Sequence, residues 1–158
     1  MDKKLEEHLG SNKVSYKLHE HPAVFTVAES KKIIMKKDYF HTKSLFLRDD
    51  KNNYYLVCMP ADKRLDISFL RKHLNLEKLY FASPEELKQE LNLSPGSVSI
   101  FGMINAKNTL LIVDKDVWDA KSVGFHPNIN TATLELSHKS LENFYNSLNL
   151  KKEIIRLE

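Results

Sequence analysis

Apolar and polar positions repeat with two different spacings along this chain, and each spacing predicts its own kind of element. Residues 14–18 alternate between apolar and polar side chains, which is typical of a half-buried strand. Apolar runs at residues 45–47 and 54–59 predict two strands, and the turn residues 49–53 between them predict a hairpin. Further strand candidates are residues 79–81, 97–104, 109–113 and 131–136, and a short apolar pair stands at residues 154–155.

Helices are predicted where apolar residues recur every three to four positions behind a capping residue. Ser83, followed by Pro84 and Glu86, has the pattern of a capping box with proline in the first turn. Thr26 and Ser137 stand before two further helical segments. The predicted helices cover residues 1–9, 26–34, 66–74, 83–91 and 137–148, with a single helical turn at 114–118.

The order of these elements predicts the fold class. Helices and strands are interspersed without a regular βαβ rhythm, and hairpins and short connections dominate, which favours a mixed α+β sheet with helices packed around it. Repeats, low-complexity tracts and Gly/Ser linkers are absent, so residues 1–158 are predicted to form a single domain. The chain also lacks the glycine-rich loops of dinucleotide and P-loop nucleotide sites.

Composition predicts a soluble globular protein, and the single cysteine favours the cytoplasm. Apolar residues make up 42% and charged residues 28% of it. No apolar run approaches the roughly 20 residues that cross a bilayer, so no membrane association is expected. The N-terminal residues are charged, unlike a signal peptide, and a single cysteine fits a reducing compartment.

Charge is unevenly distributed along the chain, although its net value is only +3. Residues 1–79 carry 16 lysines and arginines against 11 acidic residues, and residues 80–158 carry 8 against 10. A polyanion such as a nucleic acid could bind the basic half. Lysine pairs on solvated helix faces explain the same pattern.

Metal and thiol chemistry find little support. His19 and His21 alternate and would share one face of a strand, but no cysteine or carboxylate stands at ligand spacing beside them. Cys58 lies in an apolar run and is interpreted as a buried small hydrophobic residue rather than a nucleophile. We therefore expect neither a metal nor another cofactor.

Two polar segments are the candidates for chemistry. Residues 124–133 hold a glycine, a histidine, a proline, two asparagines and two threonines just before an apolar run, a pattern that fits either a polar turn or a ligand site. Residues 41–47 place Lys43 at the entrance to a strand. An ammonium there is expensive to bury unless it faces a cleft or a partner. Lys43 is thus either a cleft residue or an edge-strand lysine that opposes aggregation.

With these segments the chain resembles the YbaK/ProX family, the prolyl-tRNA synthetase-associated editing domains that also occur as free-standing proteins. The matching segments follow the family's order and span residues 14–147. They are residues 21–26 (HPAVFT), 41–49 (HTKSLFLRD), 81–87 (FASPEEL), 95–102 (PGSVSIFG) and 125–133 (FHPNINTAT).

The resemblance implies a partly barrel-like mixed sheet surrounded by helices, and trans-editing as the activity. The reaction would be hydrolysis of the ester that joins a wrong amino acid to tRNA(Pro). The chain looks closest to the free-standing branch that removes alanine, and the branch that removes cysteine is the alternative. The implied partners are the acceptor end of tRNA(Pro) and prolyl-tRNA synthetase.

The family's key lysine corresponds to Lys43, which could stabilise the developing oxyanion or anchor the terminal ribose and phosphate. Ser44 stands where the alanine branch often has asparagine, and Ile100 replaces the proline of the family's Gly-x-x-x-Pro loop. His126 is expected to shape the pocket rather than to act as a general base. The other expected substrate-binding residues are Val24, Thr26, Ser44, Leu45, Gly96, Ser97, Val98, Gly124, Pro127, Asn130 and Thr131, of which Val24, Thr26 and Leu45 could equally be core residues.

Two other functions stay open at this point. The departures at Ser44 and Ile100 are compatible with a non-catalytic module that binds an aminoacyl-tRNA or a synthetase. A metal hydrolase is a third hypothesis, and it predicts sensitivity to chelators.

Overall fold

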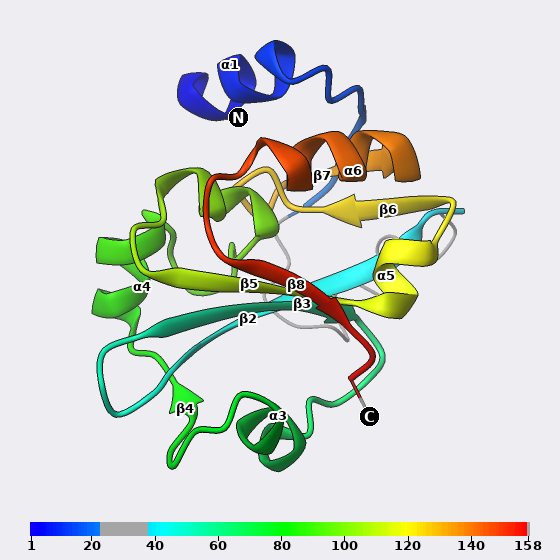
Figure 1. Ribbon diagram of the computed structural model, residues 1–158. Coiled ribbons are helices and arrows are strands. Elements are labelled where there is room, and N and C mark those ends of the chain that lie inside the picture. Colours follow the sequence, from blue (N-terminus) through cyan, green and yellow to red (C-terminus); the bar gives the residue numbers. More distant parts are fainter. Residues whose placement is uncertain (23–37, 158) are drawn as a thin grey trace.

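An eight-stranded mixed sheet organises the chain in the computed structural model, which describes residues 1–22 and 38–157 (Figure 1). The predicted helix at residues 26–34 lies outside the described residues, as do Val24 and Thr26. The strands are β1 (Lys17–Glu20), β2 (Phe40–Arg48), β3 (Tyr54–Pro60), β4 (Tyr80–Phe81), β5 (Thr109–Asp114), β6 (Ser122–Phe125), β7 (Ala132–Ser137) and β8 (Lys152–Ile155). The helices are α1 (Lys3–Ser11), α3 (Ile67–His73), α4 (Pro84–Leu91), α5 (Lys115–Asp119), α6 (His138–Ser147) and the 3₁₀ helix η1 (Ile100–Asn105).

Pairing in the sheet is mixed, as the pattern of elements predicted. The strand order is β1-β7-β6-β2-β3-β5-β8, with β4 attached to β2. β2 and β3 form the predicted antiparallel hairpin, whereas β3–β5, β5–β8 and β2–β6 are parallel. Within the described part of the chain the sheet stays open, with β1 and β8 at its two ends.

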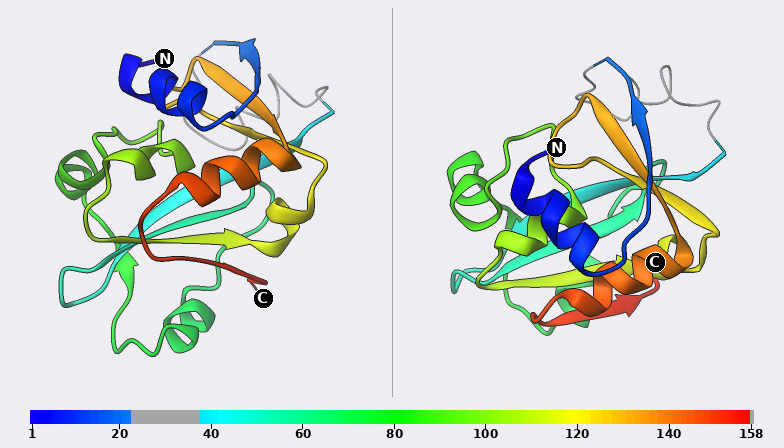
Figure 2. Two further views of the ribbon diagram at one scale, coloured as in Figure 1. Left: turned by 45° about the horizontal axis from the view of Figure 1, so that its top comes forward. Right: turned by 90° about the horizontal axis from the view of Figure 1, so that it is seen from above.

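Helices cover both faces of this sheet (Figures 1 and 2). Leu56 and Cys58 of β3 face a large core that also takes in residues of α1, α4, η1 and α6. Their neighbour Val57 faces a smaller core under α3, which contributes Leu70. Alternate β3 side chains therefore enter different cores, and this explains why the strand reads as a continuous apolar run. Cys58 is fully buried, and burial raises the pKa of its thiol to about 12, in agreement with a structural role.

Side-chain caps fix where the helices begin. Ser83 and Glu86 form the predicted capping box at the start of α4. Asp66, Asp114 and Ser137 each accept a hydrogen bond from a backbone N–H in the first turn of α3, α5 and α6. The N-terminal ends of these helices agree with the predicted boundaries, because capping is a local interaction that can be predicted from the sequence.

Three sequence predictions are corrected by the structure. Residues 97–104 do not form a strand: Ser99 caps η1 through a hydrogen bond from the Phe101 N–H, and the buried apolar residues that follow pack into the core as a 3₁₀ helix. The strand expected at residues 14–18 begins only at Lys17, and most of it is exposed. β6 was not predicted: its last two residues, Gly124 and Phe125, begin the polar segment 124–133, and its first two, Ser122 and Val123, belong to no predicted element.

No helix in the described ranges is both long enough and apolar enough to cross a membrane.

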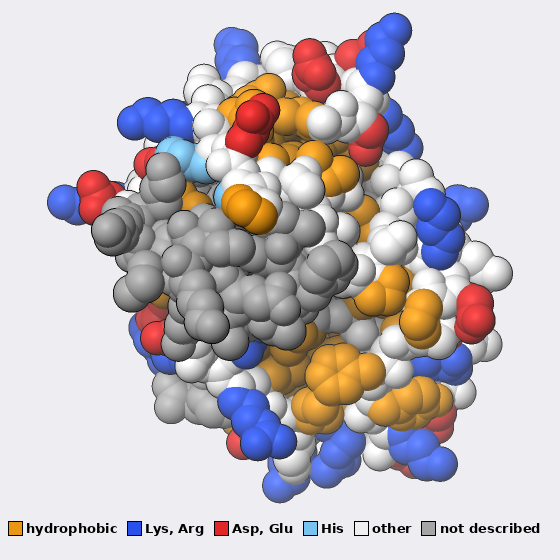
Figure 3. Space-filling model, turned by 180° about the vertical axis from the view of Figure 1, so that it is seen from behind, with side chains coloured by type: hydrophobic (Ala, Val, Ile, Leu, Met, Phe, Trp, Pro, Cys, Tyr) orange, Lys and Arg blue, Asp and Glu red, His pale blue; other side chains and the backbone are white. Residues whose placement is uncertain are grey.

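Figure 3 shows a group of apolar side chains on the face opposite to that of Figure 1, with lysine and arginine side chains around it.

The β2–β3 turn is organised by one buried carboxylate. Asp49 is 1% exposed and accepts hydrogen bonds from the N–H groups of Lys51 and Asn53 and from the Tyr55 hydroxyl. Burial opposes ionisation of Asp49, but these hydrogen bonds outweigh it and lower the pKa of the carboxyl group.

We therefore expect Asp49→Ala to lower the free energy of unfolding by about 1–3 kcal/mol at pH 7, because it leaves buried donors unpaired. A group with a lowered pKa stabilises the fold above its unfolded value of about 3.9 and loses this contribution as the pH falls. The difference from wild type should therefore shrink in acid, as followed by urea unfolding. Asp50→Ala, at the exposed neighbouring position, is the control; an equal loss there would contradict the role of Asp49.

Candidate functional site

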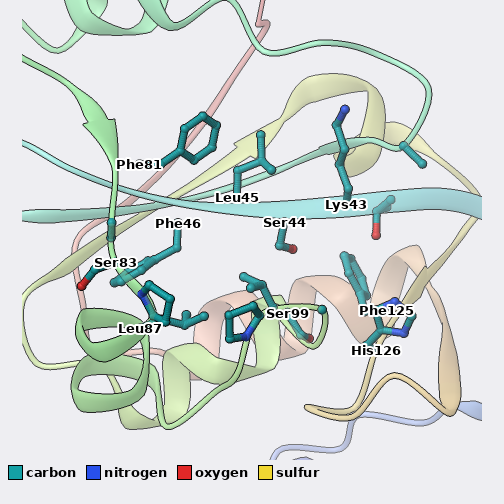
Figure 4. A pocket seen from close by; sticks show the side chains of 17 residues that line it. Lys43, Ser44, Leu45, Phe46, Phe81, Ser83, Leu87, Ser99, Phe125 and His126 are labelled. Atoms are coloured by element: carbon teal, nitrogen blue, oxygen red, sulfur yellow. The ribbon is translucent and has the colours of Figure 1, made fainter. Parts of the chain in front are cut away.

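A cavity of about 380 Å³ opens beside β2 (Figure 4). Its walls come from β2, the start of α4, the loop before η1, and the end of β6. The lining residues are Thr42, Lys43, Ser44, Leu45, Phe46, Ala61, Phe81, Ala82, Ser83, Pro84, Leu87, Pro95, Gly96, Val98, Ser99, Phe125 and His126.

The cavity lies where one edge of β2 lacks a strand partner. β3 pairs with β2 throughout residues 42–48. On the opposite edge β6 pairs only with Phe40 and His41, and β4 only with Leu47 and Arg48. Among the described strands none pairs with the intervening stretch of that edge.

Backbone hydrogen bonds show which groups this open edge presents. The His41 carbonyl points toward β3, where it accepts from the Ala61 N–H, and the Phe46 carbonyl points the other way, where it accepts from the Ala82 N–H. Because backbone groups alternate along a strand, the N–H and C=O of Ser44 turn toward the open edge. A ligand in the cavity could therefore use a backbone donor and acceptor as well as side chains.

Side chains of β2 divide between the two faces of the sheet beside this edge. Lys43 and Leu45 project on the same side as Phe81 (Figure 4). Ser44 and Phe46 project on the other side of β2, where Ser99 and His126 lie near Ser44 and Leu87 lies near Phe46. The cavity thus has one wall that carries an ammonium group and another lined by hydroxyl, aromatic and imidazole groups.

Lys43 is partly buried in the cavity wall. Burial lowers the pKa of its ammonium group, and the negative charge of Asp62 partly opposes that shift. No salt bridge joins Lys43 to a carboxylate within the described residues. As far as the described residues go, the Lys43 charge takes part in no ion pair and could act on a ligand that brings negative charge or a polarised oxygen.

His126 is held as a neutral ring in the wall. Its Nδ1 lies 3.0 Å from the Ala132 carbonyl oxygen, so Nδ1 carries the hydrogen and Nε2 is left as an acceptor. Burial lowers the pKa of the imidazole and favours the neutral ring, although the hydrogen bond to the Ala132 carbonyl partly opposes that shift. His21 approaches the ring edge-on at 6.1 Å and is itself tied through Nε2 to the Thr133 hydroxyl. This fixed placement agrees with a residue that shapes the cavity.

The structure brings only some of the expected site residues into the cavity wall. Lys43, Ser44, Leu45, Gly96, Val98 and His126 line it. Ser97, Gly124, Pro127, Asn130 and Thr131 do not. Of these, Gly124 supports the site from behind, because its carbonyl accepts a hydrogen bond of 2.6 Å from the Thr42 hydroxyl. The other four lie in the loops that flank the wall.

The loop before η1 depends on a left-handed glycine. Gly96 has φ 89°, a conformation that side chains other than glycine rarely adopt, and the turn is closed by a hydrogen bond from the Ser97 N–H to the Ser94 carbonyl. Ile100, which stands in place of the family's proline, is fully buried at the start of η1 and does not line the cavity.

Several lining residues were not anticipated from the sequence. Phe81 lies in a predicted strand, Ser83 was assigned only a capping role, and Ser99 lay in a strand prediction that proved wrong. Nothing in their local patterns marks them as cavity residues, because tertiary packing alone brings them beside β2. Clusters of three or more side chains able to bind a metal are absent from the described part of the chain.

The chain belongs to the aminoacyl-tRNA editing domain family, whose model matches residues 21–144. It is 38% identical over 133 residues to the prolyl-tRNA editing protein ProX of Acetoanaerobium sticklandii, a match that covers 82% of this chain and 81% of that protein. It is 30% identical over 139 residues to prolyl-tRNA synthetase associated domain-containing protein 1 of Mus musculus, covering 84% and 82%.

Solved structures share the fold over the whole chain. The structure described as a "putative trans-editing enzyme for prolyl tRNA synthetase" superposes with a TM-score of 0.77 at 18% identity, covering 100% of this chain and 98% of that one. The hypothetical protein APE2540 gives a TM-score of 0.79 at 22% identity, covering 98% and 99%. These likenesses confirm the predicted α+β fold.

Close packing behind the cavity makes Gly124 sensitive to substitution. A Cβ atom at this position would lie 2.3 Å from the Tyr39 ring and 2.9 Å from the Thr133 methyl group. Tyr39 is itself buried, so its ring has little room to move. The hydrogen bond from Thr42 to the Gly124 carbonyl would have to shift with the backbone.

We expect Gly124→Ala to lower the free energy of unfolding by about 1–3 kcal/mol through overpacking, as measured by urea denaturation. Gly10→Ala is the matched control, because a Cβ there meets nothing within 4 Å and Gly10 lies in α1. Alanine is favoured over glycine in a helix by about 1 kcal/mol, so this control should be stabilising. A Gly124→Ala protein as stable as wild type would contradict the packing argument.

Proposed function

We propose that this protein hydrolyses the ester bond of tRNA(Pro) mischarged with alanine. The single observation that supports the proposal best is the position of Lys43 in the cavity wall. This lysine is a partly buried cation that shares a cavity with an open strand edge and lacks a carboxylate partner among the described residues. Membership of the aminoacyl-tRNA editing family gives the substrate class, and the names of the relatives point to proline as the cognate amino acid.

The reaction needs only polarisation of the ester and a positioned water. Water adds to the carbonyl carbon, the bond from that carbon to the ribose oxygen breaks, and the ribose oxygen takes up a proton. Alanine then leaves as the free amino acid. The Lys43 ammonium would stabilise the oxyanion that develops on the carbonyl oxygen, or anchor the terminal ribose and phosphate. The neighbouring ribose hydroxyl of the tRNA could assist proton transfer.

Backbone and side-chain groups around Lys43 suit the other parts of such a substrate. The Ser44 N–H at the open edge of β2 can donate a hydrogen bond to the substrate beside the lysine. The turn at Gly96 faces the same cavity and could contact the terminal nucleoside. The uncharged His126 ring would limit the size of the cavity without competing for the water's proton.

Discrimination against proline would then be a matter of size. Leu45, Val98 and Phe125 are apolar residues in the cavity wall. Forcing a larger group into a packed site costs about 1–3 kcal/mol. Correctly charged Pro-tRNA(Pro) would therefore be spared. The acceptor end of tRNA(Pro) is the proposed direct partner, and prolyl-tRNA synthetase is the proposed source of the mischarged substrate.

The first experiment measures release of the amino acid from Ala-tRNA(Pro), Cys-tRNA(Pro) and Pro-tRNA(Pro). We expect the highest kcat/KM with Ala-tRNA(Pro). Lys43→Ala should lower it by about 10²–10³-fold, the usual cost of losing one oxyanion-stabilising group. Lys51→Ala is the control, because Lys51 is an exposed lysine in the turn of the same hairpin. A wild-type protein without deacylase activity, or a fully active Lys43→Ala protein, would refute the proposal, and preference for Cys-tRNA(Pro) would reassign the substrate.

The pH profile tests the charge state that Lys43 needs. If the ammonium form is the active one, kcat/KM must fall as the pH rises through the pKa of Lys43, and burial places that fall below the usual range of a lysine. We expect this alkaline limb in wild type, after subtraction of spontaneous ester hydrolysis. The residual activity of Lys43→Ala should lack the limb; an identical limb in both proteins would assign it to another group.

A further inference from the structure

Two adjacent aromatic side chains stand exposed at the end of the cavity that is farther from Lys43. Tyr80 and Phe81 make up the whole of β4 and are 42% and 56% exposed. Phe81 is the more exposed of the two although it lines the cavity. A large apolar ring that is part cavity wall and part surface is a feature of binding sites more than of cores.

The two rings have different surroundings, because successive side chains of a strand point to opposite faces. Tyr80 pairs with Arg48, whose guanidinium carbon lies 5.4 Å from the centre of the tyrosine ring. Arg48 is in turn bound to Glu86 at 2.6 Å. The Tyr80 ring therefore already packs against the Arg48 guanidinium group within the protein. No other aromatic ring packs on Phe81 in the part of the chain that the structure describes.

The backbone that carries Phe81 is firmly held on both sides. Phe81 is registered opposite Leu47 of β2, and the next residue, Ala82, donates to the Phe46 carbonyl. Ser83 then begins α4 through its capping box. Because these bonds fix the main chain, the ring is presented without the ordering cost that a flexible loop would pay on binding.

Phe81 also lies in line with Lys43. The two residues project on the same side of β2, with Leu45 between them (Figure 4). The pairing of Phe81 with Leu47 places it four residues along the strand from Lys43, which corresponds to about 13 Å of extended backbone. One wall of the cavity thus has a cation at one end, an aliphatic side chain in the middle and an open aromatic face at the other end.

We propose that the Phe81 ring stacks on the terminal, unpaired nucleobase at the 3′ end of the tRNA while the ester lies beside Lys43. This inference rests on the proposed deacylase function and assigns one part of its substrate. The 3′ end of a tRNA is single-stranded, and aromatic rings bind unpaired bases by stacking without sequence preference. A neutral, planar base suits an aromatic ring on which no charged group of the described residues packs, whereas the anionic parts of the substrate suit Lys43.

The test compares two substrates that share the ester and differ in the base. One is Ala-tRNA(Pro), and the other is the 2-hydroxyethyl ester of alanine, which keeps a neighbouring hydroxyl group but has no base. Phe81→Ala should raise KM for Ala-tRNA(Pro) about 10- to 100-fold, as expected for loss of one stacked base. It should leave kcat/KM for the base-free ester within twofold of wild type. Phe81→Trp should restore the KM for Ala-tRNA(Pro).

Tyr80→Ala is the matched control, because it removes the neighbouring ring on the other face of the same strand. It should leave the KM for Ala-tRNA(Pro) unchanged. A Phe81→Ala protein that loses the same factor on both substrates would overturn the proposal and place the ring against the amino acid. A loss seen only when prolyl-tRNA synthetase is present would also overturn it, because the ring would then contact a protein.

A binding measurement separates this proposal from the deacylase function itself. The uncharged trinucleotide CCA and its analogue without the terminal base are titrated against wild type, Phe81→Ala and Tyr80→Ala. We expect wild type to bind CCA about tenfold or more tightly than the abasic analogue, and Phe81→Ala to bind both equally. This result does not need turnover, so it would stand if no aminoacyl-tRNA were hydrolysed. Equal binding of CCA by wild type and Phe81→Ala would contradict the stacking role.

Discussion

The proposed site depends on an interruption in the pairing of one strand edge. β2 is paired on both sides near its ends, with β6 at Phe40–His41 and with β4 at Leu47–Arg48; between these points β3 is its one strand partner among residues 1–22 and 38–157. An unpaired edge is normally a liability, because its N–H and C=O groups invite another strand. In this chain the edge borders a cavity, and the short length of β4 and of the β2–β6 pairing leaves the middle of that edge without a described strand beside it.

The surroundings of the gap keep it in one shape. Thr42 is tied to the Gly124 carbonyl, Ala82 to the Phe46 carbonyl, and Ser83 begins α4 at the far wall. β3 pairs with the opposite edge of β2, and burial of its side chains in the two cores holds β3 in place. Lys43 is therefore held partly buried; the charge of Asp62 acts on it, but no salt bridge joins it to a described carboxylate. The fold thus places a cation and a backbone donor beside one cavity, which is the arrangement that the proposed hydrolysis requires.

Sequence patterns predicted what is local and missed what depends on distant contacts. The β2–β3 hairpin, the α4 capping box and the buried Cys58 were predictable because period and capping chemistry are local. β6 was missed because its four residues become a strand only by pairing with β2 and β7. Residues 97–104 looked like a strand, but Ser99 turns them into η1. In the site, Lys43 and His126 could be singled out by type and resemblance, whereas Phe81 and Ser99 join them only through the fold.

The central claim is that the open stretch of β2 binds the aminoacylated end of a tRNA. The most direct measurement follows the backbone amide signals of the ¹⁵N-labelled protein by NMR while a non-hydrolysable amide analogue of 3′-alanyl-adenosine is added. We predict that the largest shift changes fall at Lys43–Leu45, Phe81, Gly96 and His126, with Ser44 N–H among the strongest, and that they vanish in Lys43→Ala. Shifts confined to another surface, or none at saturating analogue, would contradict the account.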